Sequence, residues 1–124
     1  MNERLKNLHM VVLMGGPGSE REVSLRSGAA VANALRQGGY RVTALEIAGP
    51  DFELPPDAGL CVNMIHGTFG EDGALQEILD ARGIPYTGEG AAGSRVAFDK
   101  KESKRRFEMA GIPTARWEMI AAGE

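Results

Sequence analysis

An acidic residue, Glu20, follows a glycine-rich turn in a position suited to binding a small cationic group. The turn has the sequence Gly-Gly-Pro-Gly-Ser at residues 15–19, and it separates a short apolar run at 10–14 from an amphipathic segment. A carboxylate beside such a turn can accept hydrogen bonds from a ligand's ammonium group. It can equally complement the positive end of the following helix dipole. The residues alone leave both roles open.

The spacing of Ser19 and Glu22 is that of a capping box. In this motif the serine oxygen accepts from the amide three residues on, and the glutamate reaches back to the serine amide. We therefore expect Glu22 to have a structural role. Glu20, expected at the first helical position, is then the carboxylate left over for a ligand.

His66 directly follows an apolar run at 60–65 and opens the glycine-rich stretch His-Gly-Thr-Phe-Gly-Glu-Asp-Gly. Glycines allow a close approach between the backbone and a ligand. A histidine here either faces that ligand or is simply a hydrogen-bonded residue at a strand end. Glu71 and Asp72 are expected in the acidic first turn of the next helix.

Lys100 and Lys101 lie at the expected start of a charged helix over 100–110, which Asp99 and Glu102 would cap and Gly111 would end. The dipole disfavours cations at a helix start, whereas the exposed amides attract anions. A bound phosphate would remove this conflict, and two solvated lysines are the alternative interpretation.

The elements that position these residues alternate along the chain. Apolar runs predict strands at 10–14, 41–47 and 60–65, and helical periodicity predicts helices at 20–37 and between 73 and 83. A further strand-like piece at 114–120 has no following partner. This alternation predicts an α/β fold, a three-layer parallel sheet flanked by helices, with ligands at the carboxyl ends of the strands.

Composition narrows the classes of function. The chain has 124 residues, 43% of them hydrophobic and 25% charged, with a formal net charge of -3, which fits one globular domain and favours neither nucleic acid nor an anionic membrane as partner. No apolar stretch approaches the ~20 residues of a membrane span, so the cytoplasm is the expected compartment. The single cysteine, Cys61, lies in an apolar run and is expected to be a buried apolar residue.

A dinucleotide site at the first glycine turn is rejected. Arg21 stands where the third glycine of the G-x-G-x-x-G pattern should fall, and the anionic Glu20 would repel a pyrophosphate.

Taken together, the motifs resemble the amino-terminal domain of the D-alanine:D-alanine ligases. The resemblance runs from about residue 9 to residue 117 and rests on four blocks of different type in the same order. These blocks are Gly15-Gly16 with Ser19-Glu20-Arg21-Glu22-Val23-Ser24-Leu25 and Ser27-Gly28; His66-Gly67 with Gly70-Glu71-Asp72-Gly73; Pro85-Tyr86-Thr87-Gly88; and Asp99-Lys100.

The resemblance implies a pre-ATP-grasp fold and an ATP-dependent ligase that joins two D-alanines through an acyl phosphate, for peptidoglycan synthesis. It implies that Glu20, as the catalytic and substrate-binding residue, accepts the ammonium of the first D-alanine. Val23 would line the same pocket, with His66 nearby. Lys100 would contact an ATP phosphate, and no residue of this chain is assigned to a metal.

The resemblance also implies what lies outside this domain. Residues 1–112 would form the amino-terminal domain, and 113–124 would begin a central ATP-grasp domain. ATP and Mg²⁺ would act in the complete ligase, whereas this chain alone is expected to bind neither and to be inactive. Expected partners are D-alanine, ATP, the remaining domains of the ligase and a second copy in a homodimer.

The chain departs from the family pattern at two positions. Glu89 stands where the family usually has serine, and Phe98 replaces a usual methionine. We expect Glu89 to face solvent, because a carboxylate near ATP phosphates would be unfavourable. Two alternatives stay open: a non-catalytic module that binds a small molecule or a protein, and a domain of a D-alanine:D-lactate or D-alanine:D-serine ligase.

Overall fold

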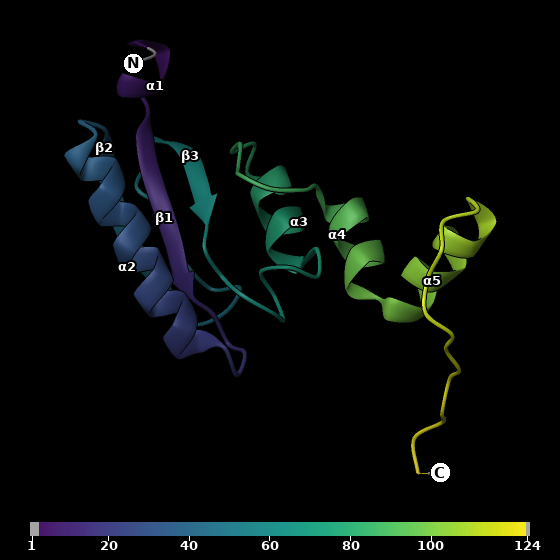
Figure 1. Cartoon of the computed structure of the whole chain (residues 1–124). Coiled ribbons are helices and arrows are strands. Elements are labelled where there is room, and N and C mark those ends of the chain that lie inside the picture. The colour runs from purple at the N-terminus through teal and green to yellow at the C-terminus, as the bar shows by residue number, and fades with distance from the viewer. Residues whose placement is uncertain (1–2, 124) are drawn as a thin grey trace.

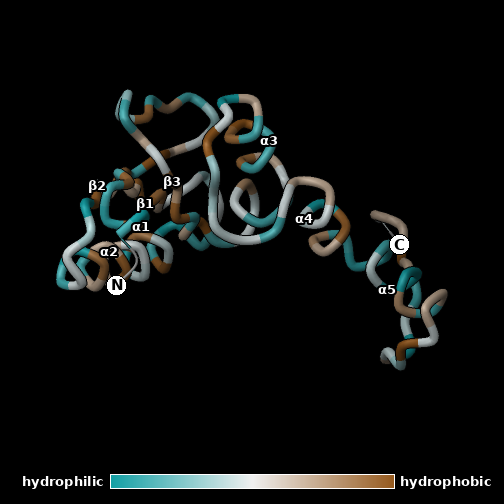
Figure 2. Tube along the Cα trace, turned by 90° about the horizontal axis from the view of Figure 1, so that it is seen from above, coloured by the Kyte–Doolittle hydropathy of each residue, from teal (hydrophilic) through white to brown (hydrophobic). Residues whose placement is uncertain are grey.

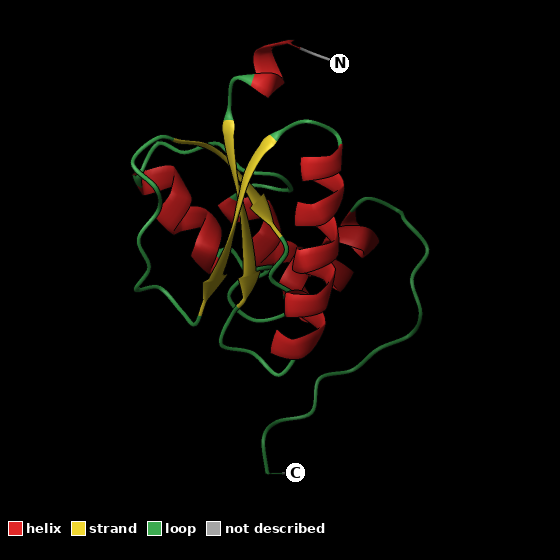
Figure 3. Cartoon of the chain, turned by 90° about the vertical axis from the view of Figure 1, so that its left-hand side faces the viewer, coloured by secondary structure: helices red, strands yellow, loops and turns green. Residues whose placement is uncertain are grey.

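A parallel sheet of three strands forms the centre of the computed structural model, which describes residues 3–123 (Figure 1). The strands are β1 (His9–Gly15), β2 (Arg41–Ile47) and β3 (Ala58–Asn63), and their order in the sheet is β2-β1-β3. All three arrows point the same way (Figure 3). β1 takes the middle position because it is the continuous apolar run, and a central strand of a parallel sheet is buried on both faces.

Helices cover both faces of this sheet. α2 (Arg21–Gln37) packs on β1 and β2, and α3 (Ala74–Ala81) lies on the opposite side of the strands (Figure 2). The predicted three-layer α/β fold is therefore confirmed. α1 (Glu3–Lys6) is a single turn before β1, and none of the helices within residues 3–123 is long and apolar enough to cross a membrane.

The two faces of β1 pack against different helices. Val11 and Leu13 belong to the main core cluster together with Leu75 and Leu79 of α3. On the other face Met14 lies under α2 at Gly28, where an added Cβ would lie 2.5 Å from the Cβ of Met14. Glycine at that position therefore allows α2 to approach the strand closely.

Cys61 lies in the core cluster, and its side chain is fully buried. Burial raises the pKa of the thiol to about 11, so it is protonated at neutral pH. The expectation of a buried apolar residue is confirmed.

Beyond the sheet the chain continues as α4 (Ala91–Phe98) and α5 (Lys100–Met109), which lead away from the strands (Figure 1). The sequence pattern does not predict α4. Its eight residues bury only Ser94, so the apolar periodicity that marks α2 is weak there. β3 also starts earlier than expected, at Ala58, and ends at Asn63.

The strand-like piece at 114–120, for which no following partner was expected, forms no strand. The segment is irregular and runs beside α5, where the Nζ atom of Lys104 donates to Oγ1 of Thr114 (2.7 Å) and to the carbonyl of Ala115 (3.2 Å). Nε1 of Trp117 donates to a carboxylate oxygen of Glu108 (2.7 Å). No strand in the described part of the chain pairs with this segment, and a strand needs a partner for its backbone groups.

Candidate functional site

The candidate site lies where β1 and β3 end, at the carboxyl edge of the sheet. The turn after β1 and the loop after β3 adjoin there: a Cβ added to Gly16 would lie 2.6 Å from a side-chain carbon of Ile65, and one added to Gly18 would lie 3.8 Å from the Cβ of Thr68. The expectation that both loops share this edge is confirmed.

Glu20 is the N-cap residue of α2, because the helix begins at Arg21. Its carbonyl accepts the first helical hydrogen bond, from the amide of Ser24 at 3.0 Å. No side chain caps this helix, so the predicted capping box of Ser19 and Glu22 is wrong. Because the N-cap is Glu20, Ser19 lies one residue outside the capping position, and the side chains of Ser19 and Glu22 are both exposed.

Arg21 closes the turn from the other side. Its Nη1 atom donates to the carbonyls of Gly16 and Ile47, both at 2.9 Å, and its Nη2 atom pairs with Glu46. The guanidinium is thereby held against β2. It does not neutralise the neighbouring Glu20.

The carboxylate of Glu20 lies against the loop after β3. A Cβ added to Gly67 would lie only 2.4 Å from Oε2 of Glu20, so the absence of a side chain at Gly67 makes room for this carboxylate. Within residues 3–123, the side chain of Glu20 forms no hydrogen bond or ion pair, and the residue is exposed. It is therefore free to accept hydrogen bonds from a ligand.

His66 directly precedes Gly67 in sequence and contacts α2 in space. Its Nε2 atom lies 2.9 Å from Oγ of Ser27. Positions 20, 23 and 27 share one face of the helix start. Val23, at 48% exposure, is therefore free for contact on the same face as Glu20 and Ser27.

His66 also lines an open cleft of about 360 Å³ between the loop after β3 and the start of α4. Glu89 lines the same cleft, and its Oε1 atom accepts from the amide of Gly90 at 3.0 Å. Glu89 is exposed, as expected. The rest of the lining comprises Asn63, Met64, Ile65, Gly70, Glu71, Gln76, Thr87, Gly88, Ser94 and Ala97.

Two acidic side chains hold the loop after β3 in shape. Oε2 of Glu71 accepts from the amide of Gly67 (2.7 Å), and Asp72 accepts from the amides of Phe69 and Ala74, both at 3.0 Å. The expectation that Glu71 and Asp72 belong to a helical turn is wrong, because α3 starts only at Ala74. Both carboxylates accept hydrogen bonds from backbone amides of this region, which have no partner in a β-sheet.

Lys100 is the first residue of α5 and is exposed. It lines a different hollow, which shares only Ala97 with the cleft beside His66, so the structure does not bring it next to Glu20. One of the two hydrogen bonds of the predicted cap forms: Oδ1 of Asp99 accepts from the amide of Glu102 at 3.1 Å. Oε1 of Glu102 instead accepts from Nε of Arg106 at 3.2 Å.

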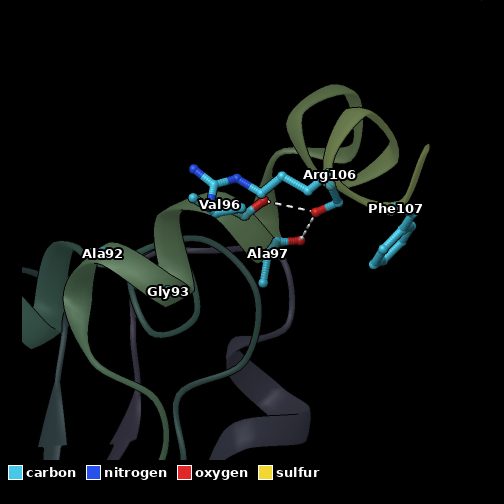
Figure 4. A pocket seen from close by; sticks show the side chains of 7 residues that line it. Ala92, Gly93, Val96, Ala97, Arg106 and Phe107 are labelled. Carbon is cyan, nitrogen blue, oxygen red and sulfur yellow. Dashed lines mark hydrogen bonds between the residues drawn. The ribbon is translucent and has the colours of Figure 1, made fainter. Parts of the chain in front are cut away.

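A separate apolar groove lies between α4 and α5 (Figure 4). Ser103 joins the two helices there by donating from Oγ to the carbonyls of Val96 (2.8 Å) and Ala97 (3.4 Å). The charged residue that lines the groove is Arg106, and no carboxylate or imidazole lines it. The site of chemistry is therefore assigned to the edge of the sheet.

No family model matches the chain. It is 47% identical over 116 residues to a D-alanine–D-alanine ligase of Methylacidiphilum infernorum and 44% identical over 120 residues to one of Xanthobacter autotrophicus, with 94% of this chain covered in each case. Those alignments span 38% and 39% of the relatives' own length.

Solved structures agree. The D-alanine–D-alanine ligase of Aeromonas hydrophila matches with a TM-score of 0.83 and 32% identity, over 95% of this chain and 52% of that one. The Bacillus anthracis ligase, solved in complex with ATP, matches with a TM-score of 0.85 and 30% identity, over 94% of this chain and 41% of that one.

The parallel sheet, the helices on both of its faces and the two adjoining loops at its carboxyl edge define an α/β domain. Along nearly its whole length this domain is homologous to the amino-terminal domain of the D-alanine–D-alanine ligases. The chain spans about two-fifths of the length of the curated relatives it matches.

Proposed function

We propose that this chain is the amino-terminal domain of an ATP-dependent D-alanine–D-alanine ligase and supplies part of the site for the first D-alanine. The observation that carries the proposal is the carboxylate of Glu20, which lies against Gly67 without a described partner, in a chain homologous to these ligases. The reaction joins two D-alanines through D-alanyl phosphate, in the cytoplasm, for peptidoglycan synthesis.

Each of these residues would contact a different chemical group of D-alanine. Glu20 accepts hydrogen bonds from the ammonium group, and Val23 offers an apolar surface for the methyl group from the same helix face. His66 adds a polar ring beside Glu20. A charge-assisted hydrogen bond such as that of Glu20 contributes roughly 1.5–3 kcal/mol.

The residues fit a phosphate contact better than a metal site. Lys100 is exposed at the first turn of α5, where a cation and unpaired amides together suit an ATP phosphate. Within residues 3–123, no group of three His, Cys, Asp or Glu side chains is arranged to hold a metal ion. We therefore assign no role in Mg²⁺ binding to these residues.

The wider assembly is part of the same proposal. Residues 113–124 would begin the central ATP-grasp domain after an amino-terminal domain of residues 1–112, and the ligase would act as a homodimer. The relatives' names favour the dipeptide ligase over a D-lactate or D-serine ligase and over a non-catalytic module.

The test uses a chimera in which this chain replaces the corresponding segment of the M. infernorum relative. Glu20→Gln keeps the shape of the side chain but removes its charge. We expect the KM for the first D-alanine to rise at least about tenfold, which is the effect of losing a charge-assisted hydrogen bond. Steady-state kinetics with D-alanine varied measures this change.

The matched control is Glu22→Gln, which removes an exposed carboxylate from the first turn of the same helix. It should leave the KM within about twofold, because a solvated charge off the site contributes little. An unchanged KM in the Glu20→Gln chimera, with its fold retained, would remove Glu20 from the D-alanine site.

A further inference from the structure

Ser27 contacts the imidazole ring of His66. It lies on α2, 39 residues before His66 in sequence, and its Oγ atom is 2.9 Å from Nε2 of the imidazole. The same hydroxyl donates to the carbonyl of Ser24 at 3.2 Å. A carbonyl oxygen only accepts hydrogen bonds, so the single hydroxyl proton of Ser27 is used there.

With its proton on the Ser24 carbonyl, the oxygen of Ser27 is left as an acceptor, and we infer that Nε2 of His66 donates to it. A neutral imidazole carries one N–H, so Nδ1 then holds a lone pair. Nδ1 forms no hydrogen bond within residues 3–123.

The carbonyl that receives the Ser27 proton is itself fixed in place. Ser24 is fully buried, its Oγ atom accepts from the amide of Gly15 at 2.9 Å, and the same hydroxyl contacts the carbonyl of Met64. These contacts tie α2 to the ends of β1 and β3. The geometry around Ser27 is therefore set by the packing of the sheet and does not depend on a ligand.

We propose that Ser27 is a positioning residue, which holds His66 with Nε2 as donor and leaves Nδ1 as a hydrogen-bond acceptor. The carboxylate of Glu20 lies against Gly67, the residue after His66. A carboxylate and an imidazole lone pair on this loop would suit a ligand group with several N–H donors. Only the naming of this group as the ammonium of D-alanine rests on the proposed function. The tautomer of His66 does not.

The test is nitrogen-15 NMR of the histidine rings in the 124-residue chain without ligand, on the alkaline plateau of the ring signals. We expect His66 to be mainly in the Nε2–H form. Ser27→Ala should lower the ratio of the Nε2–H to the Nδ1–H form roughly fivefold, which is what one neutral hydrogen bond contributes. Ser27→Thr, which keeps the hydroxyl, should restore the ratio.

Ser19→Ala is the matched control, because Ser19 is an exposed serine before the same helix and has no described side-chain hydrogen bond. It should leave the ratio unchanged. An Nδ1–H form that dominates in the native chain, or an unchanged ratio in a folded Ser27→Ala chain, would overturn the proposal. A shifted tautomer combined with an unchanged KM for D-alanine in the Ser27→Ala chimera would support Ser27 as the positioning residue and count against the proposed ligand.

Discussion

The free carboxylate of Glu20 depends on a residue distant in sequence, Gly67. The backbone of Gly67 has a φ of 69°, and the space above it is filled by Oε2 of Glu20. Position 67 therefore requires glycine for two separate reasons: its backbone is left-handed, and a Cβ would occupy the space where Glu20 lies. The proposed D-alanine site needs both.

Gly67→Ala is expected to harm D-alanine binding although it removes no polar group. The new methyl group would displace the carboxylate of Glu20, so the KM for D-alanine in the chimera should rise several-fold. The left-handed backbone adds a loss of stability of roughly 1–2 kcal/mol. Kinetics and urea unfolding measure the two effects separately.

Gly83→Ala is the control for backbone strain. Gly83 has a φ of 68°, and nothing lies within 4 Å of its added Cβ. Both substitutions should cost similar stability, but only Gly67→Ala should change the KM. If Gly83→Ala raises the KM equally, the contact between Gly67 and Glu20 does not explain the effect.

At the scale of elements, a buried histidine joins the strands at the edge opposite the site. Nδ1 of His9, at the start of β1, donates to Oδ1 of Asp57 at 2.7 Å, and its Nε2 atom lies 2.7 Å from Oγ1 of Thr43 on β2. Arg41 also pairs with Asp57. This cluster fastens β1 to β2 and to the connection before β3.

The carboxylate of Asp57 makes this junction sensitive to acid. The hydrogen bond from His9, and next that from Arg41, hold the pKa of Asp57 below its ordinary value of 3.8. A lowered pKa adds stability above about pH 4, and this stability is lost as the pH falls through the folded-state pKa. Asp57→Asn should therefore destabilise the chain more at pH 7 than at about pH 2.5.

Urea unfolding at both pH values measures this change, with Asp51→Asn as the control that removes an exposed carboxylate without a described partner. The control should alter neither midpoint appreciably. A loss for Asp57→Asn that is equal at the two pH values would show that the charge of Asp57 is not the cause.

At the scale of the whole molecule, the chain divides into a packed sheet and a projecting arm. α5 contacts α4 and leads away from the strands (Figure 2), and large apolar side chains on it and after it are exposed, among them Met109 at 87%. The carboxylate of Glu20 and the ammonium of Lys100 lie on these two different parts. The proposed D-alanine and ATP contacts are therefore separate within this chain.

The chain alone is expected to be inactive. One charge-assisted contact gives roughly 1.5–3 kcal/mol, whereas enzymatic acceleration requires about 8 kcal/mol or more. In the presence of ATP, Mg²⁺ and D-alanine, phosphate release by the 124-residue chain should stay at background, and the chimera should turn over. Phosphate release that depends on D-alanine in the chain alone, at a rate comparable to that of the chimera, would contradict this expectation.

Much of the fold follows from local sequence patterns. Features that depend on residues a few positions apart are predicted correctly. They are the apolar run of β1, the glycines after α2, α3 and α5, and the cap at Asp99. The free Glu20 was also predicted, although from a capping box that does not form. The strand at 114–120 failed for the complementary reason, since a strand requires a partner that its own residues do not specify.

The sequence by itself determined which side chains can do chemistry at the edge of this sheet: a carboxylate at 20 and an imidazole at 66, each beside glycines. Only the tertiary structure decided how they meet. The contact of Ser27 with His66 and the fit of Glu20 over Gly67 depend on how β1 and β3 align and on how closely α2 packs at Gly28. Local propensity acts over a few residues, whereas these contacts join segments tens of residues apart, which only the packed sheet brings within hydrogen-bonding distance.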